Sequence, residues 1–437
     1  MSAPIKNLDA ILKKLGIREL NAMQKEAYEV ILDNPETIIL SPTGTGKTLA
    51  FLLPLLEDLD RADNELQAMI LVPSRELAMQ IEQVAREIGS GFKINAVYGG
   101  RSGSKDKAEL KHSPALLIGT PGRVADHIRR ENIYTKNVHT LILDEFDKSL
   151  ETGFENEMRE IMDALPMLRK KVLTSATQKL EIPAFTRIKN PVKLDYLSEG
   201  VARLKVEVIV SHSKNKLIML ERILGYLGDK NGIVFCSLKD TILEVSDDLQ
   251  RKNIGHTSFY GGLEQIDRER ALMKFRNGTE RILVSSDLAA RGIDVPELDY
   301  IIHFEIPEKA DEFTHRNGRT ARMNKNGRAI VIKWENEELP DFITDYQELK
   351  IDSTTEIVKS KWETLHISGG RKDKISKGDI AGLFFKQGGL KKDELGIIEL
   401  KQESSFVAVP AQKAFSLIEA LSNSRLKKKK VRISLVE

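Results

Sequence analysis

The stretch TIILSPTGTGKTLAFLLPLLEDL (37–59) joins a short apolar run to a longer apolar helical segment through a glycine-rich loop. The loop ends in Gly-Lys-Thr and has the strand before it and the helix after it that a phosphate-binding loop requires. Glycines let the backbone curl so that its N–H groups face phosphate, and a helix N-terminus favours negative charge. We therefore predict a nucleotide-binding site at Ser41, Thr43, Gly44, Thr45, Gly46, Lys47 and Thr48.

Within this loop, Lys47 is expected to reach the β and γ phosphates and the Thr48 hydroxyl to ligate Mg²⁺. Such a loop also needs a carboxylate at the end of a neighbouring strand, and LILDEFD (141–147) supplies one. We expect Asp144 to organise Mg²⁺ and Glu145 to orient and polarise the attacking water. The two segments together predict an enzyme that hydrolyses a nucleotide.

Short apolar runs alternate with amphipathic stretches from about residue 37 to residue 333. The runs are TIIL (37–40), AMILV (68–72), ALLIG (115–119), TLILD (140–144), KVLTS (171–175), GIVFC (232–236), RILVSS (281–286), LDYIIHF (298–304) and RAIVI (328–332). Runs this short and continuous suit strands that are buried on both faces. Their alternation with helices predicts an α/β fold with two doubly wound parallel sheets, whose ligands lie at the carboxyl ends of the strands.

The alternation breaks at residues 190–204, which we predict to be an interdomain linker. The domains are placed at residues 1–198 and 199–350, with a second linker at 351–362 and a last domain at 363–437. In the last domain, ETLHIS, a helical stretch near 377–387, GIIELKQ, SFVAV, a helix near 411–422 and KVRISLV give the order βαββαβ. That order predicts a small α+β split-βαβ domain, a class that includes RNA-recognition folds.

Charge is informative by region. The whole chain has 67 basic and 65 acidic residues, whereas residues 363–437 have 15 basic and 9 acidic ones and so carry +6. This asymmetry favours an anionic partner for the last domain. The one cysteine, Cys236, excludes a disulfide framework, and we predict that it is a small buried residue. Without an apolar run of about 18 residues or a signal peptide, we expect a cytoplasmic monomer with no membrane contact.

An ordered set of motifs surrounds the phosphate loop. It comprises Gln24, SPTGTGKT (41–48), PSRELA (73–78), YGGR (98–101), TPGR (120–123), DEFD (144–147), SAT (175–177), IVFCSLKD (233–240), the pair Gln265 and Arg268, SSDLAARGID (285–294) and HRNGRTAR (315–322). In this order and at these spacings the set closely resembles the DEAD-box RNA helicases, over about residues 1–340. The resemblance implies that both parallel-sheet domains are RecA-like and that ATP is used to remodel RNA.

The resemblance also implies roles for residues around the nucleotide. Gln24 would read the adenine edge, and Asp294 would contact the ribose or help to position the nucleotide. Ser175 and Thr177 would couple the ATP site to domain closure.

Two arginines of the second domain complete the catalytic set that the resemblance implies. Arg319 and Arg322 would act as arginine fingers beside Lys47 and Glu145, because permanently charged guanidinium groups suit a phosphate whose charge is increasing. Since the arginines and the loop lie in different domains, hydrolysis would require the domains to close.

The RNA-facing groups implied by the resemblance are arginines, hydroxyls and glycines. They are Arg75, Gly99, Gly100, Arg101, Thr120, Gly122 and Arg123 in the first domain and Gln265, Arg268 and Ser286 in the second. Arginines and hydroxyls bind phosphate oxygens, and glycines allow close backbone approach. We therefore expect this surface to bind the RNA backbone without regard to base sequence.

The last domain resembles the RNA-binding domain of DbpA-type bacterial helicases at TLHISGGRKDKISKGDIAGLF (364–384), VAVP (407–410) and KKVRISL (429–435). The resemblance implies an anchor on large-subunit ribosomal RNA or precursor ribosomes. The sheet positions that would stack bases are His366, Phe406 and Val409, which is less than a full aromatic platform. We therefore favour phosphate binding by a basic loop with the lysine run, formed by Arg371, Lys372, Lys374 and Lys427–Lys430.

The sequence departs from the family at a few positions. Phe146 replaces an alanine in the acidic box, which predicts a packing difference only. Leu20 and Asn21 stand in place of a Pro-Thr pair, and Asn7 stands where an aromatic residue would stack on adenine, so strict selection of ATP stays open.

The leading hypothesis is an RNA helicase that melts short duplexes, acting on large-subunit ribosomal RNA in ribosome assembly. A low-turnover ATP-gated RNA clamp or assembly scaffold and a DNA helicase are the alternatives. Glu145 and the two arginines favour turnover over a clamp, and the last domain favours RNA over DNA.

Overall fold

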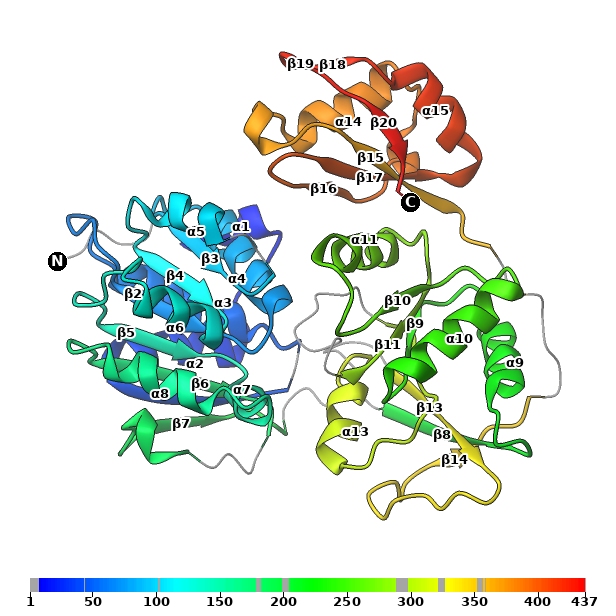
Figure 1. Ribbon diagram of the computed structural model, residues 1–437, viewed down its shortest axis with the longest axis horizontal. Coiled ribbons are helices and arrows are strands. Elements are labelled where there is room, and N and C mark those ends of the chain that lie inside the picture. The colour runs from blue at the N-terminus through cyan, green and yellow to red at the C-terminus, as the bar shows by residue number, and fades with distance from the viewer. Residues whose placement is uncertain are drawn as a thin grey trace. The chain divides into compact units, whose positions relative to one another are not determined.

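The computed structural model describes residues 8–42, 44–100, 103–177, 182–198, 204–287, 298–320, 327–351, 357 and 359–436. These residues fall into two compact units, the first ending at residue 198 and the second beginning at residue 204 (Figure 1). Each unit is built around a parallel β-sheet, and the second unit also carries a small antiparallel sheet. No helix in the described ranges is both long enough and apolar enough to cross a membrane.

The first unit is organised around a seven-stranded parallel sheet. Among the described residues its strands are β1 (Glu36–Leu40), β2 (Ala68–Leu71), β3 (Ile94–Val97), β4 (Leu116–Gly119), β5 (Thr140–Leu143), β6 (Lys170–Ser175) and β7 (Val192–Asp195). Ile39 packs into one hydrophobic core, whereas its neighbours Ile38 and Leu40 pack into another. Because successive side chains of a strand point to opposite faces, two covered faces explain why these runs are apolar throughout.

Helices connect these strands and cover both faces of the sheet (Figure 1). They are α1 (Leu8–Leu15), α2 (Ala22–Asp33), α3 (Lys47–Asp58), α4 (Arg75–Ile88), α5 (Gly103–Leu110), α6 (Pro121–Arg129), α7 (Phe146–Glu151), α8 (Glu155–Asp163) and the 3-10 turn η1 (Ala184–Thr186). Local sequence sets their boundaries, as α4 illustrates. The Ser74 hydroxyl accepts a hydrogen bond from the Leu77 amide at its first turn, and Gly89 ends it in a left-handed conformation.

The strand order divides the carboxyl edge of the first sheet into two halves. The order is β3-β4-β2-β5-β6-β1-β7, and all neighbouring strands that pair are parallel. The loops after β5, β6 and β1 are therefore neighbours on one half, and those after β3, β4 and β2 are neighbours on the other. Leu40 pairs with Ser175, which places the loop that begins at Ser41 beside the residues that follow β6.

The second unit begins with another seven-stranded parallel sheet, in the order β10-β11-β9-β12-β13-β8-β14. Its described strands are β8 (Leu204–Ser211), β9 (Gly232–Phe235), β10 (Thr257–Phe259), β11 (Ile282–Ser285), β12 (Tyr300–His303), β13 (Gly327–Trp334) and β14 (Gln347–Glu348). Its described helices are α9 (Leu217–Leu227), α10 (Lys239–Arg251), α11 (Gln265–Arg276) and α13 (Ala310–Asn317). Cys236 is fully buried after β9, and burial raises the pKa of its thiol, which confirms the prediction of a buried core residue.

The C-terminal part of this unit is the expected βαββαβ domain. Its elements are β15 (Trp362–Ile367), η2 (Arg371–Asp373), α14 (Lys377–Lys386), η3 (Lys392–Glu394), β16 (Ile398–Leu400), β17 (Ser405–Pro410), η4 (Ala411–Lys413), α15 (Ala414–Leu421), β18 (Arg425–Leu426), β19 (Lys429–Lys430) and β20 (Ile433–Leu435). The main sheet is antiparallel with the order β16-β17-β15-β20, and its core contains Leu365, Phe384 and Val407. With the two parallel sheets, this domain confirms the predicted fold class.

The open face of the small sheet carries two of the three side chains expected there. His366 and Phe406 face each other across β15 and β17, with ring centroids 5.2 Å apart. Val409 lies in the hydrophobic core instead, because positions 405, 407 and 409 alternate in direction with 406. The expectation for Val409 is therefore wrong, and the face has one stacking position fewer.

The same face contacts the end of α11 within the second unit. The buried Thr364 hydroxyl accepts a hydrogen bond from Asn277 Nδ2 at 3.2 Å and lies 2.6 Å from the Thr279 hydroxyl. Arg276 forms an ion pair with Glu399 at 3.1 Å. Protein therefore occupies this part of the sheet face and excludes base stacking there.

Glu280 makes this contact region sensitive to pH. Burial raises the pKa of Glu280 to about 7; Lys274 and Arg281 partly offset the rise, and Glu363 adds to it. In the unfolded chain a glutamate titrates near about 4.3, so between that pH and about 7 the folded chain holds the proton more tightly. The stability that this group contributes is therefore present at low pH and is lost as pH rises toward about 7.

We expect Glu280→Gln to remove this pH dependence. In urea unfolding, the wild type should lose on the order of 1 kcal/mol between about pH 5 and about pH 7, whereas the variant stays level. Tryptophan fluorescence is the measurement, because the two tryptophans of the chain, Trp334 and Trp362, both lie in the second unit. The exposed Glu264→Gln serves as a control that keeps the wild-type dependence. Parallel curves for the wild type and Glu280→Gln would contradict the assignment.

The nine apolar runs all form strands, namely β1, β2, β4, β5, β6, β9, β11, β12 and β13. The linker predicted at residues 190–204 is wrong in part, because β7 lies within it and pairs with β1. β7 stands at the sheet edge, and of its four residues only Leu194 is buried. An edge strand therefore forms here without the apolar run by which the others are recognised.

Candidate functional site

The loop between β1 and α3 is shaped around the Lys47 ammonium. Lys47 is buried, and its Nζ donates hydrogen bonds to the Ser41 carbonyl at 2.5 Å and the Pro42 carbonyl at 2.9 Å. Gly44 and Gly46 have φ angles of 82° and 85°, a region that glycine adopts without strain. A curled backbone with a buried cation at a helix N-terminus suits an anion with several oxygens, such as a polyphosphate.

The hydroxyls of the loop brace its turn. The Thr45 hydroxyl lies 2.6 Å from Ser41 Oγ and donates to the Pro42 carbonyl at 2.9 Å. Thr48 is the second residue of α3 and remains partly exposed at the mouth of the loop. Thr43 lies outside the described residues.

Gln24 connects α2 to the loop. Its Nε2 donates to the Gly46 carbonyl at 3.1 Å, and its Oε1 accepts from the Asn21 amide at 3.0 Å. A Cβ at Gly46 would lie close to Gln24 Nε2, the end of a flexible side chain, and it is the φ of 85° that favours glycine at this position. Asn21 caps α2, and its Nδ2 donates to the Thr45 carbonyl at 3.0 Å. Asn21 is thus a loop-supporting residue that was not predicted, although its spacing from Gln24 is that of a capping box.

Asp144 is a buried carboxylate directly after β5. The Thr174 hydroxyl donates to its Oδ1, and the Glu145 amide donates to Thr174 Oγ1 at 3.1 Å. Burial raises the pKa of Asp144, while Thr174 and the Lys47 ammonium partly offset that rise. Glu145 has a φ of 47°, which turns the chain sharply from β5 into α7. Since a buried charge is costly without a partner, this carboxylate is suited to a cation.

Ser175 and Thr177 follow β6, next to the loop. The Ser175 hydroxyl accepts from the Thr177 amide at 3.0 Å, and the Ser41 amide donates to the Ser175 carbonyl at 3.0 Å. Ser175 therefore touches the phosphate loop through its backbone.

Asp147 was not predicted as a site residue, yet both of its carboxylate oxygens are buried without a hydrogen-bond partner among the described residues.

These groups fit a nucleotide that carries its own metal. Mg²⁺ prefers oxygen ligands, and in nucleotide sites it is held by one or two side chains together with phosphates and waters. The Thr48 hydroxyl and the Asp144 carboxylate are donors of this kind. Over the described ranges, no cluster of three His, Cys, Asp or Glu side chains could hold a metal by itself.

On the other half of the sheet edge, arginines lie against glycines. Arg75 is the first residue of α4, and a Cβ at Gly100 would lie 2.3 Å from its Nη1. Gly100 also has a φ of 81°, a conformation that favours glycine there. A Cβ at Gly103 would likewise lie 3.2 Å from Arg123 Nη2, and one at Gly99 would lie 3.6 Å from Arg75 Nε and Nη2.

The start of α6 brings the remaining RNA-binding candidates of the first unit to this half. Thr120 precedes the helix as its N-cap residue, and Gly122 and Arg123 lie in its first turn. Arg101 lies outside the described residues. Because β4 stands between β3 and β2, the loops that carry Arg75, the glycine pair and Thr120 are neighbours in space.

In the second unit, Arg319 follows α13 and is buried, with its amide donating to the Arg316 carbonyl at 3.1 Å. Arg322 and Asp294 lie outside the described residues. One of the two predicted arginine fingers, Arg319, therefore lies just after the end of α13. That end of the helix is fixed by a buried ion pair.

Arg316 is the group that holds this end. Its fully buried guanidinium donates to both oxygens of Asp287, from Nε at 2.7 Å and from Nη2 at 2.5 Å, and to the Glu305 carbonyl at 2.8 Å. Burial and the nearby guanidinium lower the pKa of His303 to about 3, so this neighbour is neutral. Neither Arg316 nor Asp287 was predicted, although each lies inside a quoted motif, because the motifs do not indicate that the two residues pair.

The other RNA-binding candidates of this unit follow adjacent strands. Arg268, in the first turn of α11, donates to the Tyr260 carbonyl at 3.1 Å and lies 4.4 Å from the Phe259 ring centroid. Gln265 begins the same helix, and Ser286 follows β11, which pairs with β10. The parallel register thus brings these positions to one edge of the second sheet.

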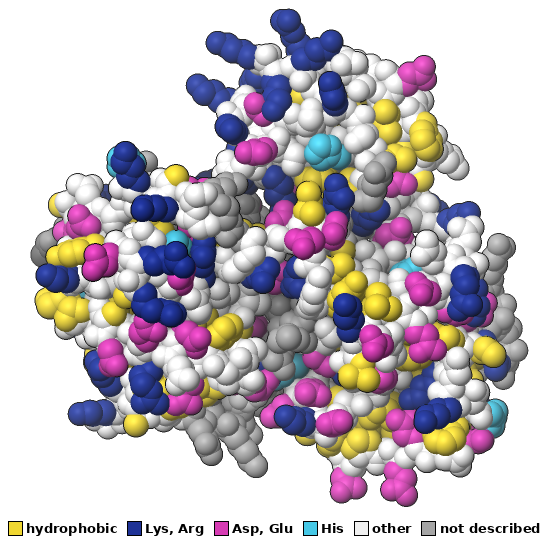
Figure 2. Space-filling view, viewed as in Figure 1, with side chains coloured by type: hydrophobic (Ala, Val, Ile, Leu, Met, Phe, Trp, Pro, Cys, Tyr) yellow, Lys and Arg dark blue, Asp and Glu magenta, His cyan; other side chains and the backbone are white. Residues whose placement is uncertain are grey.

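Lysine and arginine side chains gather over the end of the C-terminal domain that carries β18 and β19 (Figure 2). Lys429 Nζ lies 2.8 Å from Asp373 Oδ2 and so joins the lysine run to the turn Arg371–Asp373. Lys372 is exposed, and Lys374 ends the turn with a φ of 61°. Two basic segments that are distant in sequence therefore form one surface.

Three family models match consecutive parts of the chain: the DEAD/DEAH box helicase at residues 21–184, the helicase conserved C-terminal domain at 215–324 and the DbpA RNA binding domain at 364–435. The ATP-dependent RNA helicase DbpA of Bacillus subtilis is 31% identical over 97% of this chain and 96% of its own length. Its Escherichia coli counterpart is 30% identical over 98% and 96%.

A solved structure supports the same fold. S. cerevisiae Dbp5 bound to RNA and ADP BeF3 aligns with a TM-score of 0.70 at 23% identity, covering 78% of this chain and 93% of that one. The motifs, the matched domains and the two relatives matched along nearly their whole length agree. This chain therefore belongs to the DEAD-box ATP-dependent RNA helicases and carries a DbpA-type RNA-binding domain.

Proposed function

We propose that the chain melts short RNA duplexes on large-subunit ribosomal RNA during ribosome assembly, and that its basic C-terminal surface anchors it there. As a member of its family it is an RNA-stimulated ATPase and RNA helicase. The observation that supports the anchor is the ion pair between Lys429 and Asp373, which joins two basic segments into one surface. Protein contacts already cover part of the sheet face, which favours phosphate binding at the edge over base stacking.

ATP would bind the loop after β1 together with Mg²⁺. The Lys47 ammonium would exchange the Ser41 and Pro42 carbonyls for phosphate oxygens, since all three groups already meet in the loop. The Thr48 hydroxyl and the Asp144 carboxylate would hold the ion, which neutralises phosphate charge when it is bound. The Gln24 amide, hydrogen-bonded to the Gly46 carbonyl, would link recognition of adenine to the position of the loop.

Hydrolysis would depend on groups from both units. Glu145 would orient the attacking water, and its left-handed backbone lies at the turn directly after Asp144. Arg319 and Arg322 would stabilise the charge that develops on the transferring phosphoryl group. Asp294 would position the nucleotide, and Ser175 would transmit the state of the loop because its carbonyl bonds the Ser41 amide.

RNA would follow the other half of the first sheet edge and the matching edge of the second sheet. In the first unit the contacts would come from Arg75, Gly99, Gly100, Arg101, Thr120, Gly122 and Arg123, and in the second from Gln265, Arg268 and Ser286. No base-specific group is required, because backbone contacts position RNA without reading its sequence. Preference for ribosomal RNA would therefore come from the C-terminal surface, including Arg371, Lys372 and Lys374.

Neutralising the basic surface is expected to remove the preference for ribosomal RNA while sparing general RNA stimulation. In Lys372→Gln/Lys428→Gln, the apparent affinity for a large-subunit ribosomal RNA fragment should fall by roughly tenfold, because each lost phosphate contact weakens binding electrostatically. The affinity for unstructured polyuridylate should stay unchanged. RNA-stimulated ATPase titrations with the two RNAs measure both values.

The matched control is Lys386→Gln/Lys392→Gln, which removes the same charge from exposed positions elsewhere in the same domain. It should retain the wild-type preference. An equal loss in both double variants would assign the effect to net charge alone. If Lys372→Gln/Lys428→Gln keeps its preference, the anchor is not on this surface.

A further inference from the structure

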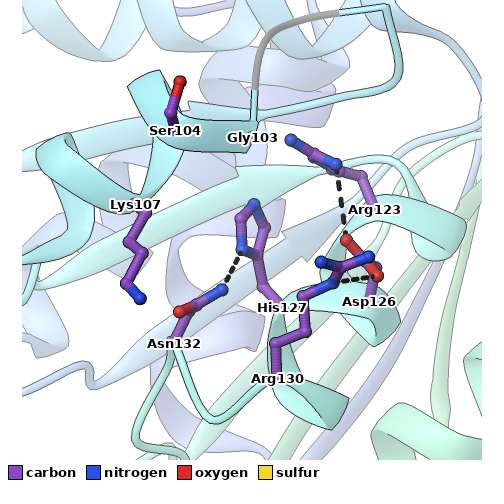
Figure 3. A pocket seen from close by; sticks show the side chains of 8 residues that line it. All are labelled: Gly103, Ser104, Lys107, Arg123, Asp126, His127, Arg130 and Asn132. Carbon is purple, nitrogen blue, oxygen red and sulfur yellow. Dashed lines mark hydrogen bonds and ion pairs between the residues drawn. The ribbon is translucent and has the colours of Figure 1, made fainter.

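A hollow of about 560 Å³ lies between α5 and α6 in the first unit (Figure 3). Lys107 of α5 stands on one side, and Arg123 and Arg130 of α6 and its C-terminal cap stand on the other. Arg123 belongs to the RNA path described above, whereas Lys107 and Arg130 lie in none of the helicase motifs. The hollow therefore lies next to the proposed RNA-binding half of the sheet edge, and its side chains Lys107 and Arg130 have no role in the proposed RNA path.

Arg123 and Arg130 present their charged groups at one wall of the hollow. Their backbones lie seven residues and roughly 10 Å apart along α6 and its cap, but their guanidinium groups converge. The two side chains share Asp126, whose oxygens lie 3.3 Å from Arg123 Nη1 and 2.7 Å from Arg130 Nε. One carboxylate thus holds both guanidinium groups at the same wall of the hollow.

The floor of the hollow is a fixed polar network. Asn132 Nδ2 donates to His127 Nδ1 at 3.1 Å, so the His127 proton is on Nε2, which faces Asp106 Oδ2 at 3.2 Å. Arg123 donates to the same Asp106 oxygen, from Nε at 3.0 Å and from Nη2 at 2.9 Å. His127 and Asp106 are buried, which leaves the cations at the rim as the groups that a ligand would meet.

The rim carries two exposed cations, of which Arg130 is only partly engaged by its neighbours. Lys107 is exposed and forms no ion pair with any described residue. Arg130 is 70% exposed and donates to Asp126 from Nε at 2.7 Å, and its Nη groups form no hydrogen bond with the residues that the structure describes. A guanidinium fork and a lysine ammonium across a hollow are the donors that a phosphate group requires.

We propose that this hollow binds one further backbone phosphate from the same RNA strand that Thr120, Gly122 and Arg123 would contact. This inference rests on the proposed RNA path and extends it along α6. Phe, Tyr and Trp are absent from the described residues that line the hollow, so the site offers no stacking platform for a base. It would lengthen the RNA site of the first unit without adding sequence preference.

The test compares two double variants of the full chain. Lys107→Gln/Arg130→Gln removes the two rim cations. Lys111→Gln/Arg129→Gln removes the same charge from exposed neighbouring positions, of which Arg129 pairs with Glu160 at 3.1 Å. Fluorescence anisotropy measures the binding of oligouridylates of increasing length, over a salt series, with a non-hydrolysable ATP analogue present.

The rim variant should bind long oligouridylate roughly tenfold more weakly, with a salt slope shallower by about 0.7 per lost phosphate contact. The loss should vanish for oligouridylates too short to extend beyond Arg123. The control variant should match the wild type at every length, and all three chains should unfold at the same temperature.

A rim variant that loses affinity equally at all lengths, or no more than the control, would overturn the proposal. A wild-type chain that binds no oligouridylate would instead overturn the RNA path on which the proposal rests. The two failures are distinguishable because only the first leaves wild-type binding intact.

Discussion

Lys47→Ala is expected to lower ATP turnover by about 100- to 1000-fold, because the variant loses the one cation inside the phosphate loop. In the wild type, the buried Lys47 ammonium is held by the Ser41 and Pro42 carbonyls at the start of α3. Removing it leaves those carbonyls directed at phosphate oxygens, which adds repulsion to the loss of attraction. Steady-state phosphate release at saturating RNA measures the change.

The matched control is Lys216→Ala, which removes another buried lysine from the second unit. Lys216 pairs with Glu337 at 2.7 Å and donates to the Phe304 carbonyl at 3.3 Å, so its loss should lower stability while the phosphate loop is untouched. Wild-type ATP turnover in the Lys47→Ala variant would contradict the proposed nucleotide site. Glu145→Gln tests the alternative of an ATP-gated clamp. A wild-type ATP turnover no higher than that of Glu145→Gln would favour the clamp.

Arg316→Ala is expected to destabilise the second unit by about 3 kcal/mol or more, because it leaves a largely desolvated Asp287 carboxylate without its partner. The guanidinium bonds both Asp287 oxygens and the Glu305 carbonyl, and so joins the ends of β11 and β12 to α13. Turnover should fall as well, because the predicted arginine finger Arg319 lies three residues after Arg316 and its amide donates to the Arg316 carbonyl. Urea unfolding followed by tryptophan fluorescence reports on this unit alone.

Arg251→Ala is the control for this prediction. Arg251 is 73% exposed and pairs with Asp248 at 3.2 Å, so its loss should cost less than about 1 kcal/mol. Arg316→Lys should recover little, since one ammonium cannot replace a planar fork that bonds several oxygens. A double-mutant cycle with Asp287→Asn that shows no coupling would contradict the assignment.

Much of the fold and of the candidate site could be predicted from local sequence patterns. Nine apolar runs were recognisable as strands because burial on both faces leaves no polar position in them. The phosphate loop and Asp144 were recognisable because their chemistry needs particular residue types next to a strand end. The edge strand β7 and the direction of Val409 were not, because each depends on which face a neighbouring element covers.

The sequence by itself determined which residues are candidates to bind phosphate, metal and RNA, since glycine, lysine and carboxylate have suitable chemistry wherever the chain places them. Only the tertiary structure decided which of them meet. Strand order placed Asp144 beside the loop at Lys47 and grouped the RNA-binding candidates on the other half of the edge. The pair of Arg316 with Asp287, the contact of Gln24 with Gly46 and the hollow beside Arg130 join distant segments. Such contacts follow from tertiary packing. The periodicity of a sequence shows which face of an element is buried, but it does not show which distant residue packs against that face.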